Sequence, residues 1–299
     1  MSSTIAFPYV IAVKHGNNKE IRQNSRMRRL GGAEIGLGRA VMGTDSETNG
    51  RGVKVGAAMT PCTDCPLLDC PGLRQMEPER RREVEAFKQG EISLERGGQV
   101  LTQGMRSNEI YTVLSGVLIR FRLMEDGRRQ IINFLFPGDL VGLQSMLDEP
   151  MTHGVEALTP AQLCVFPRDR FIDFVGQNPD MGYDVIWLAA KEESALEEHL
   201  VALGQRNAKE RIAYLALFIL RRAEGTCLAA NGRVELSITQ GQIADMLGLS
   251  LVHTNRSMQA LRRDGLVRWS LNAIEIPDPE AVSQFVRYDP HLSNPRPYL

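Results

Sequence analysis

The stretch that decides the fold is SITQGQIADMLGLSLVHTNRSMQALRRD, which occupies residues 237–264. Ser237 or Thr239 can cap a first helix, and Gly248 then breaks that helix. Ser250 stands where the N-cap of a second helix belongs, and we expect this helix over residues 251–263. Two short helices joined by a turn that contains glycine are typical of a helix-turn-helix.

The second helix has two different faces. Leu251, Thr254, Met258 and Leu261 follow a helical spacing and predict the side that packs inward. The other side carries arginine and asparagine, which suit guanine and adenine edges in a DNA groove. The residues that we expect to contact DNA are Thr239, Ser250, Val252, His253, Asn255, Arg256, Gln259 and Arg262.

A β-hairpin is expected directly after these helices. Residues 266–269 and 273–276 have the composition of short strands and are separated by a turn at Asn272. The hairpin would make the helix-turn-helix a winged one. A generic helical hairpin with a solvated polar face is the alternative, but cap, turn, spacing and wing agree in favouring a DNA-binding element.

The charge distribution fits a nucleic-acid binder joined to an acidic domain. The 299 residues carry a net charge of −1, yet residues 59–205 hold 14 Lys/Arg against 23 Asp/Glu, and residues 206–299 hold 12 against 9. Phosphates repel the first part and attract the second. Residues 1–58 show no sustained hydrophobic period and predict a disordered extension. The chain has neither a membrane-length apolar run nor a secretory signal, so we expect a cytoplasmic protein.

Short β-type segments fill the middle of the chain. They alternate with turn signals such as Ser115-Gly116 and Asp126-Gly127. Strands this short, separated by such turns, predict a small antiparallel roll or barrel. The expected strands are residues 99–103, 110–114, 117–124, 130–136 and 162–166.

Residues 180–204 change to a helical period. Apolar residues recur at alternating steps of three and four, the spacing of a helix that pairs with a copy of itself. Glu193 interrupts the stripe, and we hypothesise that its desolvation cost keeps a dimer marginal, unless the helix rolls and leaves Glu193 in water. A core-facing helix of a monomer is the alternative. The expected dimer contacts are Ile186, Ala189, Glu193, Leu196, Leu200 and Leu203.

Several motifs together resemble those of the CRP/FNR superfamily of transcription regulators. They are GLSLVHTNR (248–256) with LRRDGL (261–266), NAKERIA (207–213), YTVLSG (111–116) and FPGDLVG (136–142). The resemblance covers residues 60–277 in the expected order. It implies an α+β fold with an N-terminal cyclic-nucleotide-binding-type β-roll, a long dimerisation helix and a C-terminal winged helix-turn-helix.

The resemblance also implies a division of the chain and a set of partners. We expect a homodimer that binds a pseudo-palindromic DNA site. The resemblance implies that this DNA-bound dimer contacts RNA polymerase. Arg256 matches the family's arginine, but Val252 stands where the best-known members carry glutamate, so their half-site cannot be carried over. The expected parts are an extension (1–58), a cysteine-containing sensory segment (59–83), the β-roll (84–178), the dimerisation helix (179–205), the winged helix-turn-helix (206–277) and a tail (278–299).

The roll lacks the signature of a cyclic-nucleotide site. Family members that bind this ligand keep a glutamate after the Gly-Asp-X-X-Gly turn and an Arg-Ser or Arg-Thr pair about ten residues later. Here the turn is followed by Leu143-Gln144, and the later stretch reads MTHG at residues 151–154. A buried phosphate would lack its arginine, so we expect no cyclic nucleotide.

Cysteine is the stronger lead to a signal. An odd count of five cysteines argues against a disulfide framework, and Cys62, Cys65 and Cys70 are close enough in sequence to ligate one centre. Thiolates hold iron–sulfur clusters or zinc. By resemblance, Cys164 stands where the oxygen-sensing FNR branch keeps its fourth ligand, which implies a [4Fe–4S] cluster that responds to oxygen or nitric oxide. Zinc and metal-free thiols stay open, because four residues separate Cys65 from Cys70 where enteric members have five.

Other classes of function find little support. No nucleophile–base constellation, phosphate loop or hydrolase motif indicates an enzyme. The rival interpretation is a regulator of the same fold that responds to a small effector in the roll, to haem on His153 or His199, or to thiol oxidation. Cys227 is expected to be a bystander.

Overall fold

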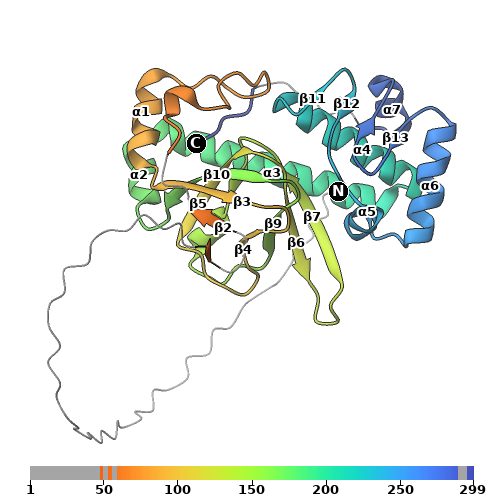
Figure 1. Ribbon diagram of the computed structural model, residues 1–299, viewed down its shortest axis with the longest axis horizontal. Helices are drawn as coiled ribbons and strands as arrows, with labels where there is room; N and C mark the ends of the chain where they lie inside the picture. Colours follow the sequence, from red (N-terminus) through yellow and green to blue (C-terminus); the bar gives the residue numbers. More distant parts are fainter. Residues whose placement is uncertain (1–47, 50–52, 56–58, 289–294) are drawn as a thin grey trace, which may run out of the picture. The chain divides into compact units, whose positions relative to one another are not determined.

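The structure, a computed structural model, describes residues 48–49, 53–55, 59–288 and 295–299 (Figure 1). These residues form a β-roll, a long helix and a helical domain with a small sheet, in that order along the chain. Within these ranges no helix combines the length and the apolar character that crossing a membrane requires.

The β-roll consists of two antiparallel sheets. Their strand orders are β1-β2-β3-β10-β5-β8 and β4-β9-β6-β7. Strand β10 lies between β3 and β5, which places Cys164 opposite Glu91 on one side and Thr112 on the other. The bounds are β1 Thr48–Asn49, β2 Val53–Val55, β3 Gly90–Leu94, β4 Gln99–Leu101, β5 Glu109–Ser115, β6 Leu118–Leu123, β7 Arg129–Leu135, β8 Leu140–Val141, β9 Gly154–Ala157 and β10 Ala161–Pro167.

Two strands lie inside the segment for which the sequence predicts disorder. Strand β2 pairs with the edge of β3 from Val53 opposite Leu94 to Val55 opposite Ile92, and β1 pairs with β2. The prediction is wrong for these five residues because main-chain pairing with an existing sheet orders them, which a test of local hydrophobicity does not detect. The rest of residues 1–58 lies outside the described residues.

Short helices cover one end of the roll. The 3₁₀ helix η1 (Cys62–Asp64) and helix α1 (Pro78–Phe87) lie between β2 and β3 in the chain, η2 (Leu143–Leu147) follows β8, and α2 (Phe171–Gln177) follows β10. Phe87 of α1 stacks on Phe174 of α2 with ring centroids 4.0 Å apart, and on Phe166 of β10 at 5.8 Å. This stack fixes the helices, and with them the cysteine segment, against the sheet that carries Cys164.

Helix α3 (Pro179–Gln205) leads from the roll to the C-terminal domain (Figure 1). One of its faces, which includes Met181, Leu188 and Ala202, is buried in its own chain. Most of the predicted dimer stripe lies on the other side: Ile186 is 69% exposed and Leu200 70%, Ala189 and Glu193 are also exposed, and Leu196 and Leu203 are half-buried. An apolar stripe left in water on a two-faced helix is the surface that a second copy would cover.

The C-terminal domain is built around helix α4 (Ala208–Gly225). An unbroken run from Ile212 to Leu220 is buried, because helices α6 and α7, the sheet and the preceding helix surround it. The sheet has the order β11-β12-β14-β13. The bounds are β11 Ala229–Ala230, β12 Arg233–Val234, α5 Gln240–Leu247, α6 Leu251–Arg263, β13 Arg268–Trp269, β14 Ile274–Glu275 and α7 Pro279–Val286.

The C-terminal segment is not the simple tail that the sequence predicts. Asp278 caps α7, whose Val282 and Val286 join the core of the domain. Residues 295–299 return to the roll, and Tyr298 and Leu299 are buried beside Cys62 and Cys70. Figure 1 shows this dark blue segment beside the orange cysteine segment. The apolar contacts of these last residues are all distant in sequence, so no local pattern reveals them.

Candidate DNA interface and cysteine site

The helix-turn-helix forms from the caps that the sequence predicts. The hydroxyl of Thr239 accepts a hydrogen bond from Gln242 N, and the Gln242 side chain accepts one from Thr239 N in return. Gly248 ends α5 with a φ of 61°, a left-handed conformation that glycine adopts without strain. Ser250 then caps α6 by accepting from His253 N at 3.3 Å. These local bonds fix the angle between the two helices and so aim α6.

Helix α6 presents its polar face to solvent. Thr254 and Leu261 are buried in the domain, while the two arginines of its last turn are exposed. Leu251 is 58% exposed, which corrects its predicted place in the core: Leu249, in the preceding turn, packs against that core. All the side chains predicted to contact DNA are exposed: Thr239, Ser250, Val252, His253, Asn255, Arg256, Gln259 and Arg262.

The first helix of this motif contacts the roll. The Arg129 guanidinium of β7 pairs with the Asp245 carboxylate of α5 at 3.2 Å and with Glu156 at 2.8 Å. Gln130 Nε2 donates to Met246 O at 3.0 Å. The position of the DNA-binding domain is therefore linked to the β6–β7 hairpin by named polar contacts.

The four predicted cluster ligands belong to one apolar cluster of side chains. Cys62, Cys70 and Cys164 are buried in it and Cys65 packs against it. Burial raises the pKa of the thiols of Cys62 and Cys65 and raises that of Cys164 to about 12. The Lys88 ammonium lowers the pKa of these three thiols, so a single cation lies near all of them.

A buried ion pair holds this cation in place. Lys88 Nζ lies 2.5 Å from Glu91 Oε1 and donates to Thr60 O at 2.9 Å. Thr60 N donates to Glu91 Oε1 at 2.8 Å, so the pair also fixes the chain two residues before Cys62. A buried positive charge suits neighbouring thiolates, because it offsets the negative charge that several of them would carry.

The donor set fits a thiolate-bound metal group, but its thiols do not converge on one point. Cys70 Sγ lies 3.7 Å from Pro66 O, and the Cys227 thiol lies nearby, 3.7 Å from Asp69 O. Over the described residues, no three His, Cys, Asp or Glu side chains converge tightly enough to hold a metal ion. Soft thiolates are the donors that iron–sulfur clusters and structural zinc prefer, so the residue types fit, and the thiols would have to move closer together to bind one centre.

A clasp that the sequence did not reveal closes over the cysteine segment. Asp139 is buried at the end of the roll turn and pairs with Arg222 of α4 at 2.5 Å and with Arg296 of the C-terminal segment at 2.7 Å. Arg296 N donates to Gly72 O at 2.7 Å, and Arg74 N donates to Arg296 O at 2.8 Å. Roll, cysteine segment, C-terminal segment and DNA-binding domain therefore meet at one carboxylate.

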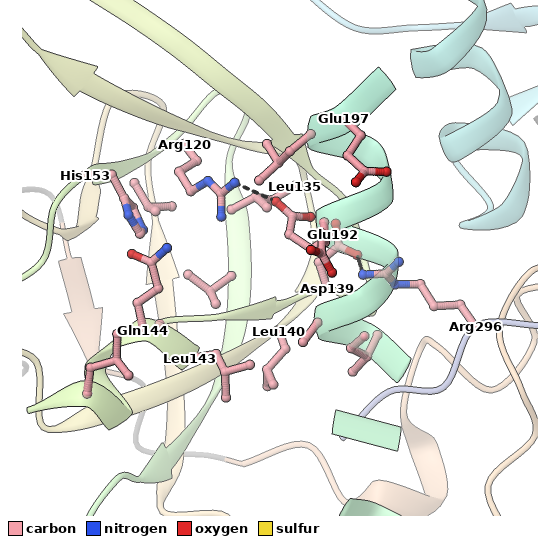
Figure 2. A pocket seen from close by; sticks show the side chains of 18 of the residues that line it. Arg120, Leu135, Asp139, Leu140, Leu143, Gln144, His153, Glu192, Glu197 and Arg296 are labelled. Carbon is pink, nitrogen blue, oxygen red and sulfur yellow. Dashed lines mark ion pairs between the residues drawn. The ribbon is translucent and has the colours of Figure 1, made fainter. Parts of the chain in front are cut away.

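The roll and α3 line an open cavity of about 600 Å³ (Figure 2). Its walls are mostly aliphatic, and Gln144 and His153 project from the roll side. The Arg120 guanidinium is paired with Glu192 of α3 at 2.8 Å, and Glu193 and Glu197 also line the wall. A phosphate placed here would meet several carboxylates, with Arg120 already engaged.

The two histidines considered as haem ligands, His153 and His199, are both buried. Burial lowers the pKa of each to about 4. His199 Nε2 lies 3.2 Å from Asn133 Oδ1, and its Nδ1 lies 2.7 Å from the Tyr214 hydroxyl. Both ring nitrogens of His199 are thus engaged in a polar network that links α3 to α4.

These features define a class of protein, a regulator with a sensory β-roll and a winged helix-turn-helix. Residues 91–178 match the cyclic nucleotide-binding domain family, and residues 210–285 match the Crp-like helix-turn-helix domain family. The transcriptional activator protein FnrL of Cereibacter sphaeroides is 31% identical over 209 residues, which are 69% of this chain and 83% of FnrL. The chain belongs to the CRP/FNR family of transcription regulators.

Two further comparisons agree with this assignment. An anaerobic regulatory protein of Pasteurella multocida is 24% identical over 218 residues, covering 73% of this chain and 80% of that protein. The solved structure of FixK2 from Bradyrhizobium japonicum has a TM-score of 0.59 and 26% identity, over 65% of this chain and 95% of FixK2. The predicted fold is confirmed, and the chain is a DNA-binding regulator of a family that works as dimers.

Proposed function

We propose that this regulator senses oxygen, or nitric oxide, through a [4Fe–4S] cluster held by Cys62, Cys65, Cys70 and Cys164. The observation that carries the proposal is that all four cysteines belong to one apolar cluster of side chains, with the Lys88 ammonium near Cys62, Cys65 and Cys164. The names of the relatives FnrL and anaerobic regulatory protein support it. When bound, the cluster would supply a centre that oxygen dismantles.

The chain's own contacts supply the route by which the signal would travel. Residues 60–72 of the segment are held at both ends: Thr60 is fixed by Glu91 and Lys88, and Gly72 bonds to Gly225, the last residue of α4. A segment held at both ends transmits a change in its middle as a change of strain at its ends. One of those ends is the central helix of the DNA-binding domain.

The stability of the dimer would be a second property that the signal changes. The exposed stripe of α3 is mainly apolar, and Glu193 is exposed within it. In a symmetric pair Glu193 would approach its own copy, so part of the stripe's apolar gain is offset by carboxylate repulsion and desolvation. Because of this balance, a signal that changes the free energy of dimerisation by a few kcal/mol would shift the equilibrium between monomer and dimer.

DNA reading would rest on α6. Arg256 and Asn255 are exposed on its polar face and are suited to guanine and adenine edges. Two such helices in a symmetric dimer would read a pseudo-palindromic site, and the bound dimer would contact RNA polymerase.

The test is chemical analysis of protein purified without oxygen. We expect about four iron and four acid-labile sulfide per chain. Cys164→Ser should lose both, whereas Cys227→Ser, which changes a cysteine outside the proposed ligand set, should retain them. Air should then remove the cluster and weaken DNA binding together. Colourless anaerobic protein without iron or sulfide refutes the proposal, and stoichiometric zinc in its place assigns the thiols to a structural metal site.

A small apolar effector in the roll cavity is the second candidate. It is favoured by the aliphatic walls and by the position of Leu196 and Leu200, which line the cavity from the dimer helix. Closure on an effector would thus act on the dimer seam. Val155→Trp, which fills the cavity from β9, should abolish a response of this kind and leave the iron content unchanged.

A further inference from the structure

The end of the cysteine segment docks directly on the DNA-binding domain. Gly72 N donates to Gly225 O at 2.9 Å. A Cβ atom built on Gly72 would lie 2.4 Å from the Cα of Gly225, closer than two carbon atoms of different residues can approach. The contact is therefore possible only because glycine occupies position 72, and it brings residues 70 and 227 to the same joint.

The two cysteines at this joint are neighbours. The Cys227 Sγ lies 3.7 Å from Asp69 O, the carbonyl group directly before Cys70. Burial raises the pKa of the Cys70 thiol to about 12, and the nearby Cys227 thiol raises it as well. Cys70 is buried and Cys227 is exposed, so one thiol is sheltered and the other can be reached from solvent.

Cys227 also occupies an unusual backbone position. Leu228 N donates to Ala223 O at 2.9 Å, which closes the end of α4 in a Schellman motif. Cys227 is the left-handed residue of that motif, with a φ of 61°. Glycine normally fills this place, since a Cβ atom is strained there. The chain accepts that strain and holds the Cys227 thiol against the carbonyl group of Asp69, the residue before Cys70.

We propose that Cys70 and Cys227 form a regulatory disulfide that joins the cysteine segment to the DNA-binding domain whenever Cys70 holds no metal. The condition that Cys70 holds no metal rests on the proposed iron–sulfur function, because a bound cluster would occupy Cys70. The disulfide itself is inferred only from the contact between residues 69–72 and residues 225–227. Cys70 then has two exclusive partners, the cluster or Cys227.

The oxidant is a hydroperoxide, and its chemistry balances in two steps. The exposed Cys227 thiolate attacks one peroxide oxygen, the O–O bond breaks, and a sulfenic acid forms as one water leaves. The Cys70 sulfur then attacks the sulfenic sulfur, the S–O bond breaks, and a second water leaves with the thiol proton. Two thiols lose two electrons, and one hydrogen peroxide becomes two waters.

The bond would tie the end of α4 to the segment covalently. The clasp of Asp139, Arg222 and Arg296 already holds the same surfaces by charge. A covalent link that closes a long loop restricts opening far more than these reversible contacts do. The orientation of α6 relative to the roll would then depend on thiol oxidation.

The test uses the full-length chain freed of metal by a chelator, reduced, and then treated with hydrogen peroxide. We expect peptide mass spectrometry to find residues 70 and 227 linked, and DNA affinity to shift at least threefold and return with dithiothreitol. Cys227→Gly is the matched control, since glycine suits the left-handed backbone: it should fold normally and show neither effect. The Cys62→Ser variant should still form the disulfide between Cys70 and Cys227.

Each other outcome decides against the proposal. A Cys227 that ends as sulfinic acid while Cys70 remains open to alkylation shows that the thiols do not pair. A bond from Cys70 to Cys65 assigns the oxidation to the ligand set, and a formed bond without any change in DNA affinity removes its regulatory role. Iron analysis of the anaerobic protein is independent of these results, so the failure of the cluster proposal can be told from the failure of this one.

Discussion

Replacing Asp139 by asparagine removes one charge from the point where four parts of the chain meet. The side chain keeps its shape and can still accept the hydrogen bond from Phe136 N, now 2.8 Å from Oδ2. Arg222 and Arg296 lose their shared counter-ion. Removing one partner of a buried ion pair costs about 3–5 kcal/mol, and we expect about 3 kcal/mol because Arg222 is 22% exposed and can turn to water.

Urea unfolding measures this change, at one fixed chain concentration because a dimer's stability depends on it. Trp187 gives a local signal, since the Arg296 guanidinium lies 6.0 Å from its ring. The matched control is Asp148→Asn: Asp148 also pairs with two arginines, Arg106 and Arg168, but is exposed. Asparagine tolerates its φ of 55°, so we expect no measurable loss. Equal effects of the two substitutions would refute the reasoning.

The pH dependence follows from the same charges. Burial would raise the pKa of Asp139, but the guanidinium groups of Arg222 and Arg296 outweigh it and lower that pKa below its usual range. A carboxyl whose pKa is depressed on folding contributes stability above its unfolded pKa of about 3.9 and loses it as the pH falls through the folded value. The stability difference between the wild type and Asp139→Asn should therefore be constant from pH 7 to 5 and shrink below about pH 4.

Three other substitutions test separate parts of the structure. Arg256→Ala should weaken specific DNA binding by about 1–3 kcal/mol in an electrophoretic assay and leave the circular dichroism unchanged, because the side chain is exposed. Leu200→Glu should shift sedimentation toward the monomer without unfolding the chain, since Leu200 is 70% exposed on the stripe of α3. Gly72→Ala should undock the cysteine segment and speed alkylation of buried Cys70, whereas Gly90→Ala, which has nothing within 4 Å of its added Cβ, should not.

Local signals in the sequence were sufficient to predict the helix-turn-helix of the DNA-binding domain. Thr239, Gly248 and Ser250 act on the backbone within a few residues, so their caps and turn can be recognised without a tertiary structure. Strands β3, β8 and β9 were not predicted from the sequence, because each is short and is ordered by pairing with strands far along the chain. Helix α1 was not predicted either, because only Val84 and Phe87 of its ten residues are buried and the helix therefore shows no apolar periodicity.

The cysteine site was predictable in its residue types but not in its surroundings. The spacing of Cys62, Cys65 and Cys70 is visible in the sequence, whereas Lys88 and Arg296 reach the site only through folding. Arg296 is the clearest case: its contacts with Gly72 and Asp139 join residues more than a hundred positions apart. No periodicity or motif around position 296 indicates such a role.

The clasp changes how a signal would reach the DNA. From the sequence we expect the signal to act through Glu193 and the dimer interface, to which both chains contribute. The structure adds a second path inside one chain, from the cysteine segment through Gly72 and Arg296 to the end of α4. The two paths differ in what they require. A monomeric Leu200→Glu variant would lose the first and keep the second, so a change in Trp187 fluorescence on oxidation that survives this substitution would assign signal transmission to the clasp.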